Sequence, residues 1–165
     1  MQAHRSTQPI TYNTNRTSLN DFHESVSDLV SPDPIKKPPT VKERLLQAEG
    51  GYYLSGEAVK LLGITEQKLE ELRQTNKIIG LPVKDGRHVY PKWQFVKRWF
   101  WGYQVLPGLA EALAEFPSES PWMRAGFMLD NGVTVEFASP LAGLKAGRIS
   151  QVVALVKGFG EHGAA

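Results

Sequence analysis

Two short segments with the apolar spacing of helices, separated by Gly63-Ile64-Thr65, constrain the fold of this chain most strongly. In the stretch LSGEAVKLLGITEQKLEELRQ, Ser55 is expected to cap a helix that runs to about Leu62, and Gly63 suits a left-handed stop. Thr65 is expected to cap the second helix, with an acidic residue in its first turn. Two short helices joined by a glycine-containing turn predict a helix-turn-helix.

A turn signal follows the second helix. The stretch IIGLPVKDGRHVYP indicates two short strands around Lys84-Asp85-Gly86-Arg87, because Asp-Gly between β-type flanks is a strong hairpin signal. A hairpin after a helix-turn-helix is a wing, and Lys84, Arg87 and His88 at its tip are placed to meet phosphate groups. His88 is equally consistent with an ordinary exposed histidine. We therefore expect a winged helix-turn-helix over residues 41–104.

The charge of this segment is consistent with nucleic-acid binding. Between Lys60 and Arg98 there are nine Lys or Arg residues against four acids, although the net charge of the whole chain is only +2. On the second helix, Leu69 and Leu72 are expected to face the core, so the opposite face carries Gln and Glu side chains that suit base edges but repel phosphates. The expected DNA contacts are Gln67, Lys68, Arg73, Gln74, Lys77, Lys84, Arg87 and His88. A scaffold used only for dimerisation or partner contact is the alternative.

In the last third of the chain, prolines mark the starts of helices. Pro107, Pro121 and Pro140 each stand where a helix can begin, and Ser120 and Ser139 are expected to cap two of these helices. The stretch SQVVALVKGF has apolar residues at i, i+3, i+4 and i+7, as on one face of a helix. The stretch VTVEF is either a brief strand or an irregular connection. Residues 105–160 are expected to form a small bundle of short helices.

The beginning of the chain has a different composition. Residues 1–40 are rich in Ser, Thr, Asn, Asp and Pro, which predicts a disordered or extended tail or, alternatively, a partner-docking segment. Thr40 and Glu43 have the spacing of a capping box for the next helix. The expected fold class is mainly α with a small β-hairpin wing, in which a winged helix-turn-helix is followed by a small bundle of short helices.

Composition argues against several classes of function. The chain has no cysteine, which excludes disulfides, zinc–thiolate sites and cysteine nucleophiles. Its four histidines are scattered without metal-ligand spacing, so we expect no metal, no cofactor and no catalysis. No apolar run approaches the roughly 20 residues needed to span a bilayer, and the first residues lack the apolar core of a signal peptide. We expect a soluble, cytoplasmic protein without a membrane partner.

Two parts of the chain resemble known families. The stretch YLSGEAVKLLGITEQKLEELRQTNKIIGLPVKDGRHVYPKWQF resembles the winged helix-turn-helix of excisionase- and MerR-like proteins, in the order helix, turn, helix, wing. The stretches VLPGLAEALAEF, PWMRAGFMLDNG and SPLAGLKAGRISQVVALVKGF resemble the C-terminal domain of Xre/MbcA/ParS-type antitoxins. The best match to that domain is at Pro140-Leu141, Leu144, Gly147 and Val152-Val153.

The antitoxin resemblance implies a partner protein. In that family, the C-terminal domain binds and blocks a RES-domain toxin that consumes NAD, and the N-terminal domain usually represses the pair's own promoter as an oligomer. This chain departs from the family in its DNA domain, which is similar to a winged excisionase type and not to a Cro repressor. The resemblance therefore bears more directly on partner binding than on promoter binding.

The expected partner surface combines aromatic residues with residues of the C-terminal helices. The run WQFVKRWFWGY cannot face one core from one helix, so part of it is expected at the joint between the two halves and part at a dimer or partner surface. Base stacking is a less favoured role for it. The expected partner contacts are Trp99, Trp101, Trp122, Leu144, Arg148, Val152, Val156 and Phe159. Such apolar spacing on helices is more often simply core.

The sequence thus predicts an antitoxin-like, homo-oligomeric DNA-binding protein that neutralises a RES-type toxin and autoregulates its promoter. The main alternative is a winged-helix transcriptional regulator, or an excisionase-like architectural factor, whose C-terminal helices serve oligomerisation without a toxin partner. A pure interaction adaptor is the third hypothesis.

Overall fold

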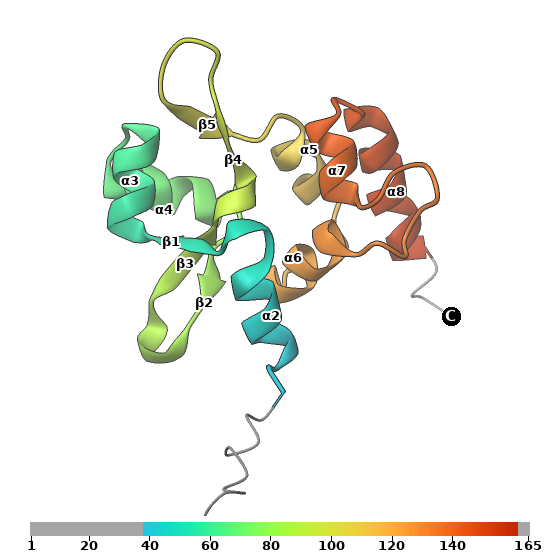
Figure 1. The fold of residues 1–165 in the computed structure, drawn as a ribbon, viewed down its shortest axis with the longest axis horizontal. Helices are drawn as coiled ribbons and strands as arrows, with labels where there is room; N and C mark the ends of the chain where they lie inside the picture. The colour runs from blue at the N-terminus through green and yellow to red at the C-terminus, as the bar shows by residue number, and fades with distance from the viewer. Residues whose placement is uncertain (1–37, 162–165) are drawn as a thin grey trace, which may run out of the picture. The chain divides into compact units, whose positions relative to one another are not determined.

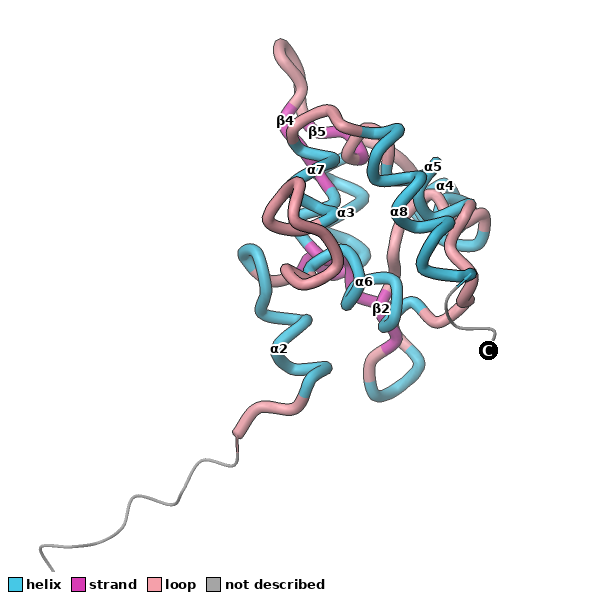
Figure 2. The backbone as a smooth tube through the Cα atoms, turned by 90° about the vertical axis from the view of Figure 1, so that its right-hand side faces the viewer, coloured by secondary structure: helices cyan, strands magenta, loops and turns pink. Residues whose placement is uncertain are grey.

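Residues 38–161 are described by the computed structural model of the chain (Figure 1, Figure 2). From Pro39 onward they belong to the second of two units into which the chain divides. They form seven α-helices and two small antiparallel sheets, which agrees with the mainly α class expected. The tail expected over residues 1–40 lies outside the described residues except for its last three.

Short-range hydrogen bonds set where the helices begin. At the start of α2 (Val41–Gln47), the Thr40 N–H donates to Glu43 Oε2 over 2.7 Å and the Glu43 N–H donates to Thr40 Oγ1 over 3.2 Å, which confirms the predicted capping box. The other confirmed caps accept backbone N–H groups in the same way, and they are Thr65 for α4 (Glu66–Gln74), Ser120 for α6 (Pro121–Leu129) and Ser139 for α7 (Pro140–Lys145).

Helix α3 (Ser55–Leu62) begins differently from the prediction. Ser55 is its first residue, and Leu54 takes the cap position. The Leu54 N–H donates to the Glu57 carboxylate over 2.8 Å, so an acid in the third helical position, instead of the Ser55 hydroxyl, satisfies a backbone group at this helix end. Gly63, with φ +66°, ends α3 in the left-handed conformation that was predicted.

Three short strands form an antiparallel sheet in the order β1-β3-β2. The strands are β1 (Tyr52–Leu54), β2 (Leu81–Pro82) and β3 (His88–Pro91). Strands β2 and β3 are the predicted hairpin, and a short 3-10 helix, Lys84–Gly86, closes it. Asp85 and Gly86 have φ values of 77° and 75°, which an Asp-Gly pair tolerates better than most residues. We name this element the cationic hairpin, because Lys84 and Arg87 lie at its turn.

The aromatic run forms a second hairpin, for which the sequence offered no specific prediction. A 3-10 helix, Lys92–Gln94, leads into β4 (Phe95–Lys97), which pairs with β5 (Tyr103–Val105). Across the turn, the Arg98 N–H donates to the Gly102 carbonyl over 3.0 Å, and Gly102 has a φ of +56°. Glycine adopts this left-handed conformation without steric cost, and so Gly102 allows the chain to turn back on itself here. We name this element the aromatic hairpin.

The described residues after β5 form helices joined by irregular segments, as predicted. Helices α5 (Leu109–Ala114), α6, α7 and α8 (Ile149–Glu161) follow one another, and the segment between α6 and α7 contains no strand within the described residues. The stretch VTVEF is therefore an irregular connection. A third 3-10 helix, Ala48–Gly50, joins α2 to β1.

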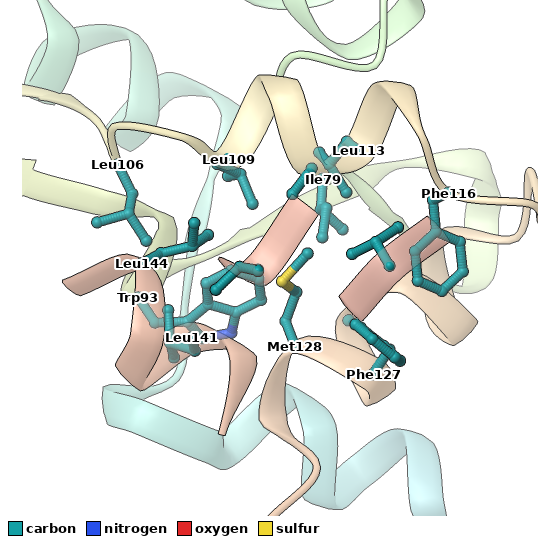
Figure 3. Close-up of a cluster of buried hydrophobic side chains, with 14 of the residues drawn as sticks. Ile79, Trp93, Leu106, Leu109, Leu113, Phe116, Phe127, Met128, Leu141 and Leu144 are labelled. Carbon is teal, nitrogen blue, oxygen red and sulfur yellow. The ribbon is translucent and has the colours of Figure 1, made fainter. Parts of the chain in front are cut away.

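Two apolar clusters hold these elements together. The smaller one packs α3 and α4 on the sheet through Ala58, Leu69, Ile78, Tyr90 and Phe95. The larger one, which we name the shared core, contains residues from both sides of the boundary expected near residue 105 (Figure 3), namely Ile79, Leu81, Val89 and Trp93 before it and Leu106, Leu109, Leu113, Met128, Leu141, Leu144, Val152 and Val156 after it. The two expected domains thus pack as one body in the structure.

A buried polar side chain ties the two hairpins to each other. Gln94 is fully buried, and its Oε1 accepts the Ile79 N–H over 2.8 Å while its Nε2 donates to the Ile79 carbonyl over 2.9 Å. The carbonyl of Gln94 accepts the Leu106 N–H over 2.8 Å. Because Ile79 precedes β2 and Leu106 follows β5, Gln94 joins the base of the cationic hairpin to the base of the aromatic hairpin.

Candidate nucleic-acid and partner interfaces

The exposed face of α4 carries charges that are paired within the helix. Gln67 and Lys68 are exposed, and Lys68 Nζ lies 2.7 Å from Glu71 Oε1. The hydrogen bond from Lys68 lowers the pKa of the Glu71 carboxyl. Lys68 was expected to contact phosphate, and here its nearest anionic partner is an acid one turn along the same helix. Pairs of this exposed kind are weak, so Lys68 remains available to exchange Glu71 for phosphate.

Glu70 organises the end of α4. Its carboxylate forms an ion pair with Arg73 and accepts a hydrogen bond from Gln74 Nε2 over 2.8 Å. The hydrogen bond from Arg73, followed by smaller contributions from Gln74, lowers the pKa of Glu70 to about 2. Arg73 is only partly exposed. Arg73 and Gln74 thus both bind the Glu70 carboxylate. Each would have to give up this contact before it could donate a hydrogen bond to a base or a phosphate.

The turn of the cationic hairpin and the nearby Lys77 carry exposed cations. Arg87 Nη2 lies 2.7 Å from Asp85 Oδ2, and both side chains are largely exposed. Lys84 and Lys77 are also exposed, and within residues 38–161 neither forms an ion pair. Since an exposed pair such as Arg87–Asp85 contributes little, all three cations are free to face an anionic partner.

His88 does not lie at the tip of the hairpin, as had been expected. It is the first residue of β3, pairs with Pro82, and is partly buried. Burial is the main cause that lowers the pKa of its imidazole; nearby Arg73 acts in the same direction, and Glu70 opposes it. The lowered pKa favours the neutral imidazole, so His88 offers a phosphate group less attraction than the exposed cations Lys84 and Arg87.

A groove lies between α2, the first turn of α3 and the cationic hairpin. It has a volume of about 850 Å³ and an apolar lining that includes Leu46, Leu54, Val83 and Trp122. Lys42 Nζ lies over the Trp122 ring, 5.2 Å from its centroid. Trp122, expected to contact a partner, is thus half-buried in the wall of this groove.

Three of the expected partner contacts are core residues, which corrects that assignment. Leu144, Val152 and Val156 are 2%, 0% and 0% exposed and belong to the shared core. Their helical spacing marks a face that packs within the shared core, where α8 contacts α5 and α7, so these side chains are not available to another protein. The apolar periodicity is the same in both cases, and only the tertiary contact distinguishes them.

The other residues of that set are at the surface. Arg148 is exposed, and its Nη1 donates to Gln151 Oε1 over 3.3 Å. Phe159 is 42% exposed, and its ring packs on Phe116 and Phe127, with centroids 5.7 Å and 4.8 Å away. Phe159 is therefore the rim of the shared core and offers only one edge to a partner.

The tip of the aromatic hairpin brings together three large, highly exposed aromatic side chains. Trp99, Phe100 and Trp101 are 89%, 79% and 80% exposed. Trp99 and Trp101 had been expected at a partner surface, whereas Phe100 had not been selected. All three rings belong to the turn between β4 and β5. They therefore do not follow the alternation of inward and outward side chains that applies within a strand.

Arg124 is a second residue that sequence reasoning missed. It is 7% exposed, and its guanidinium donates to the Ser118 carbonyl over 2.8 Å and to the Asn76 side-chain oxygen. Burial lowers its pKa. Arg124 links the start of α6 to the segment after α4. Both acceptors lie in loops, and no local sequence pattern predicts that these loops come close to Arg124.

Among residues 38–161 no group of His, Asp and Glu is arranged to hold a metal ion. The same residues include no helix that is both long and apolar enough to cross a bilayer.

Comparison of the chain with protein-family models, with curated proteins and with solved structures finds no match. The resemblances given above therefore stay predictions.

Proposed function

We propose that this chain is an antitoxin-like DNA-binding protein that neutralises a RES-type toxin and represses its own promoter. The nucleic-acid part of the proposal treats α3, α4 and the β1-β3-β2 sheet as a winged helix-turn-helix with the cationic hairpin as the wing. The toxin part rests on the resemblance of the C-terminal helices to those of Xre/MbcA/ParS-type antitoxins.

One observation carries the DNA-binding proposal. Helix α4 and strand β3 share the smaller apolar cluster through Leu69 and Tyr90, so α4 and the cationic hairpin are held on one frame. That frame supports an exposed helix face and a turn with Lys84 and Arg87 in a fixed relation to each other. A helix in the major groove together with a cationic turn on the adjacent backbone is a combination that DNA-binding proteins use.

The salt dependence of DNA binding tests this proposal. We expect the full-length protein to bind its own promoter duplex with an affinity that falls steeply with added salt. The double substitution Lys84→Ala with Arg87→Ala removes two proposed phosphate contacts, so the slope of log K against log salt should decrease in magnitude by about 2. A fluorescence anisotropy titration at several salt concentrations measures both quantities.

A matched control uses two exposed cations on α8 or at its start. Arg148→Ala with Lys157→Ala removes the same formal charge and should leave the slope unchanged. Equal slopes for the wild type and the Lys84/Arg87 variant would show that the cationic hairpin does not contact phosphate.

The toxin part is tested by recovering the native protein from its own cells, with and without nuclease, and identifying what accompanies it by mass spectrometry. We expect a near-stoichiometric RES-type protein that persists after nuclease treatment. Recovery of DNA alone, lost on nuclease treatment, would contradict the antitoxin proposal.

A second candidate function is a winged-helix transcriptional regulator or an excisionase-like architectural factor without a toxin. The observation in its favour is that Leu144 and Val152, where the antitoxin pattern matches best, are consumed by the shared core. Under this alternative the C-terminal helices stabilise the DNA-binding frame and mediate self-association. Recovery of the native protein with DNA alone, described above, is the outcome that favours it.

A further inference from the structure

The aromatic hairpin has a packed base and an exposed tip. Phe95, at the start of β4, is 6% exposed, and its ring centroid lies 6.1 Å from that of Tyr53 in β1. Beyond this base the two strands carry the turn away from the helices, as both views show (Figure 1, Figure 2). The packed base therefore holds the tip residues, Trp99, Phe100 and Trp101, in solvent.

Three adjacent aromatic side chains in water are unfavourable unless a partner covers them. A large aromatic side chain buries about 150–250 Å² when it is enclosed. Three of them supply a large part of the roughly 800 Å² that each side contributes to a standard protein interface. Exposed apolar patches of this size mark interaction sites more often than they occur by chance.

The composition of the tip favours a protein partner. Trp, Tyr and Arg are the residues that dominate the binding energy of protein interfaces, and the tip combines Trp99 and Trp101 with Arg98 and Tyr103. Lys97 and Arg98 are exposed, and residues 95–105 contain no acidic side chain. A complementary surface thus has an apolar pocket for rings and an acidic rim.

The location of the tip separates it from the turn of the cationic hairpin. The aromatic hairpin and the cationic hairpin project at opposite ends of the described unit in both views (Figure 1, Figure 2). A partner that covers Trp99 and Trp101 leaves the turn at Lys84 and Arg87 uncovered. Binding at the two hairpins is therefore compatible in one complex.

We propose that the tip Trp99-Phe100-Trp101 is the anchor by which this chain holds its partner protein, the rings entering an apolar pocket with an acidic rim, while the cationic hairpin holds DNA in the same complex. This inference rests on the proposed function, because the partner is the toxin of that proposal. It moves the main contact away from the C-terminal helices, whose apolar faces are buried, to a hairpin that the antitoxin resemblance does not include.

The test uses the full-length protein and the purified RES-type protein that accompanies it in cells. In the variant Trp99→Ser with Trp101→Ser, calorimetric affinity for that protein should fall on the order of 100-fold, since each ring acts as a hot spot. Affinity for the promoter duplex should change by less than about threefold. The control Val41→Ser with Val135→Ser also replaces two exposed apolar residues, 61% and 104% exposed, and should bind both ligands like the wild type.

A mobility-shift experiment tests the simultaneous complex. Adding the RES-type protein to the wild-type protein on its promoter duplex should give a slower band containing all three components, whereas the Trp99/Trp101 variant should give only the DNA complex. The thermal melting curve of the variant should match that of the wild type, because both rings lie in solvent. Competition between DNA and the partner protein would overturn the separation of the two sites.

The remaining outcomes each decide between the proposals. If the wild type accompanies no protein, the proposed toxin function and this inference both fail. If the wild type and the Trp99/Trp101 variant bind the partner equally, only this inference fails. Loss of DNA binding in the variant would reassign the tip to nucleic acid, and loss of binding to vesicles of phosphatidylglycerol and phosphatidylcholine, with partner binding intact, would reassign it to a lipid surface.

Discussion

The two hairpins of this chain are built alike and present opposite chemistry. Each reverses direction through a glycine in the left-handed region, Gly86 at φ +75° and Gly102 at φ +56°, and each is attached to the body through Gln94. The turn of the first contains Lys84, Asp85 and Arg87, whereas the turn of the second consists largely of exposed rings. The comparison shows that the backbone device and the chemistry of the turn are independent, so one small frame can serve two kinds of partner.

Removing the polar tie between the hairpins should have the largest effect on stability. The substitution Gln94→Leu leaves the buried N–H and C=O of Ile79 without partners, and we expect a loss of about 3 kcal/mol in the free energy of unfolding. Denaturant unfolding measures this loss. Gln47→Leu, at an exposed position in α2, is the control and should change stability little. A loss below about 1 kcal/mol for Gln94→Leu would show that the hairpins do not depend on this tie.

The two turns should be equally sensitive to a side chain at their glycines. Gly86→Ala and Gly102→Ala each force a Cβ into a left-handed conformation, while no atom lies within 4 Å of the added carbon. Only backbone strain remains, so each substitution should cost about 1 kcal/mol in thermal unfolding experiments. Gly56→Ala, in the first turn of α3 and likewise without neighbours within 4 Å, is the matched control and should be neutral or slightly stabilising. Unequal costs at the two turns would break the parallel between them.

Acid should weaken the Glu70–Arg73 pair at the end of α4 and leave the aromatic hairpin untouched. The pKa of Glu70 is about 2 in the folded protein, below its ordinary value of 4.5, so its contribution to stability is present above pH 4.5 and is lost as the pH falls toward 2. The side chain of Glu70 is 43% exposed, so solvent screening keeps this contribution below about 1 kcal/mol.

The matched variant for this smallest effect is Glu70→Gln. It should flatten the decline of the unfolding free energy below pH 4.5, measured by denaturant unfolding at a series of pH values. Residues 95–105 contain neither an acid nor a histidine, so the aromatic hairpin should show no such titration, for example in the fluorescence of its tryptophans. An unchanged pH dependence in Glu70→Gln would remove Glu70 as the cause.

Sequence patterns predicted the first hairpin and missed the second for a physical reason. Asp85-Gly86 specifies its own turn, because both residues tolerate positive φ and the flanks are β-type. The run around Trp99 has only Gly102 as a turn residue, and aromatic side chains are compatible with strand, helix or loop. The helix caps at Thr40, Thr65, Ser120 and Ser139 were predictable because their hydrogen bonds close within three residues.

The candidate site was less predictable, because it depends on contacts between distant segments. Helical spacing identified the apolar face of α8 but not what covers it, and Val152 and Val156 proved to face the chain itself. The groove beside Trp122 is lined by α2 and by a hairpin about 40 residues further along the chain, and no local sequence pattern predicts that these two elements lie together. The sequence placed Trp99 and Trp101 at a partner surface, but only the hairpin shows that Phe100 is exposed beside them.

The shared core has a consequence for how long the molecule lasts in a cell. Ile79 and Trp93 share one core with residues of α5 to α8, so unfolding the chain from the C-terminal helix would also weaken the support of both hairpins. Degradation from that end then abolishes the proposed grip on the partner and the proposed grip on DNA in a single event. Under the proposed function, destruction of this chain would therefore release the partner and the promoter at the same moment, without any separate signal to coordinate the two.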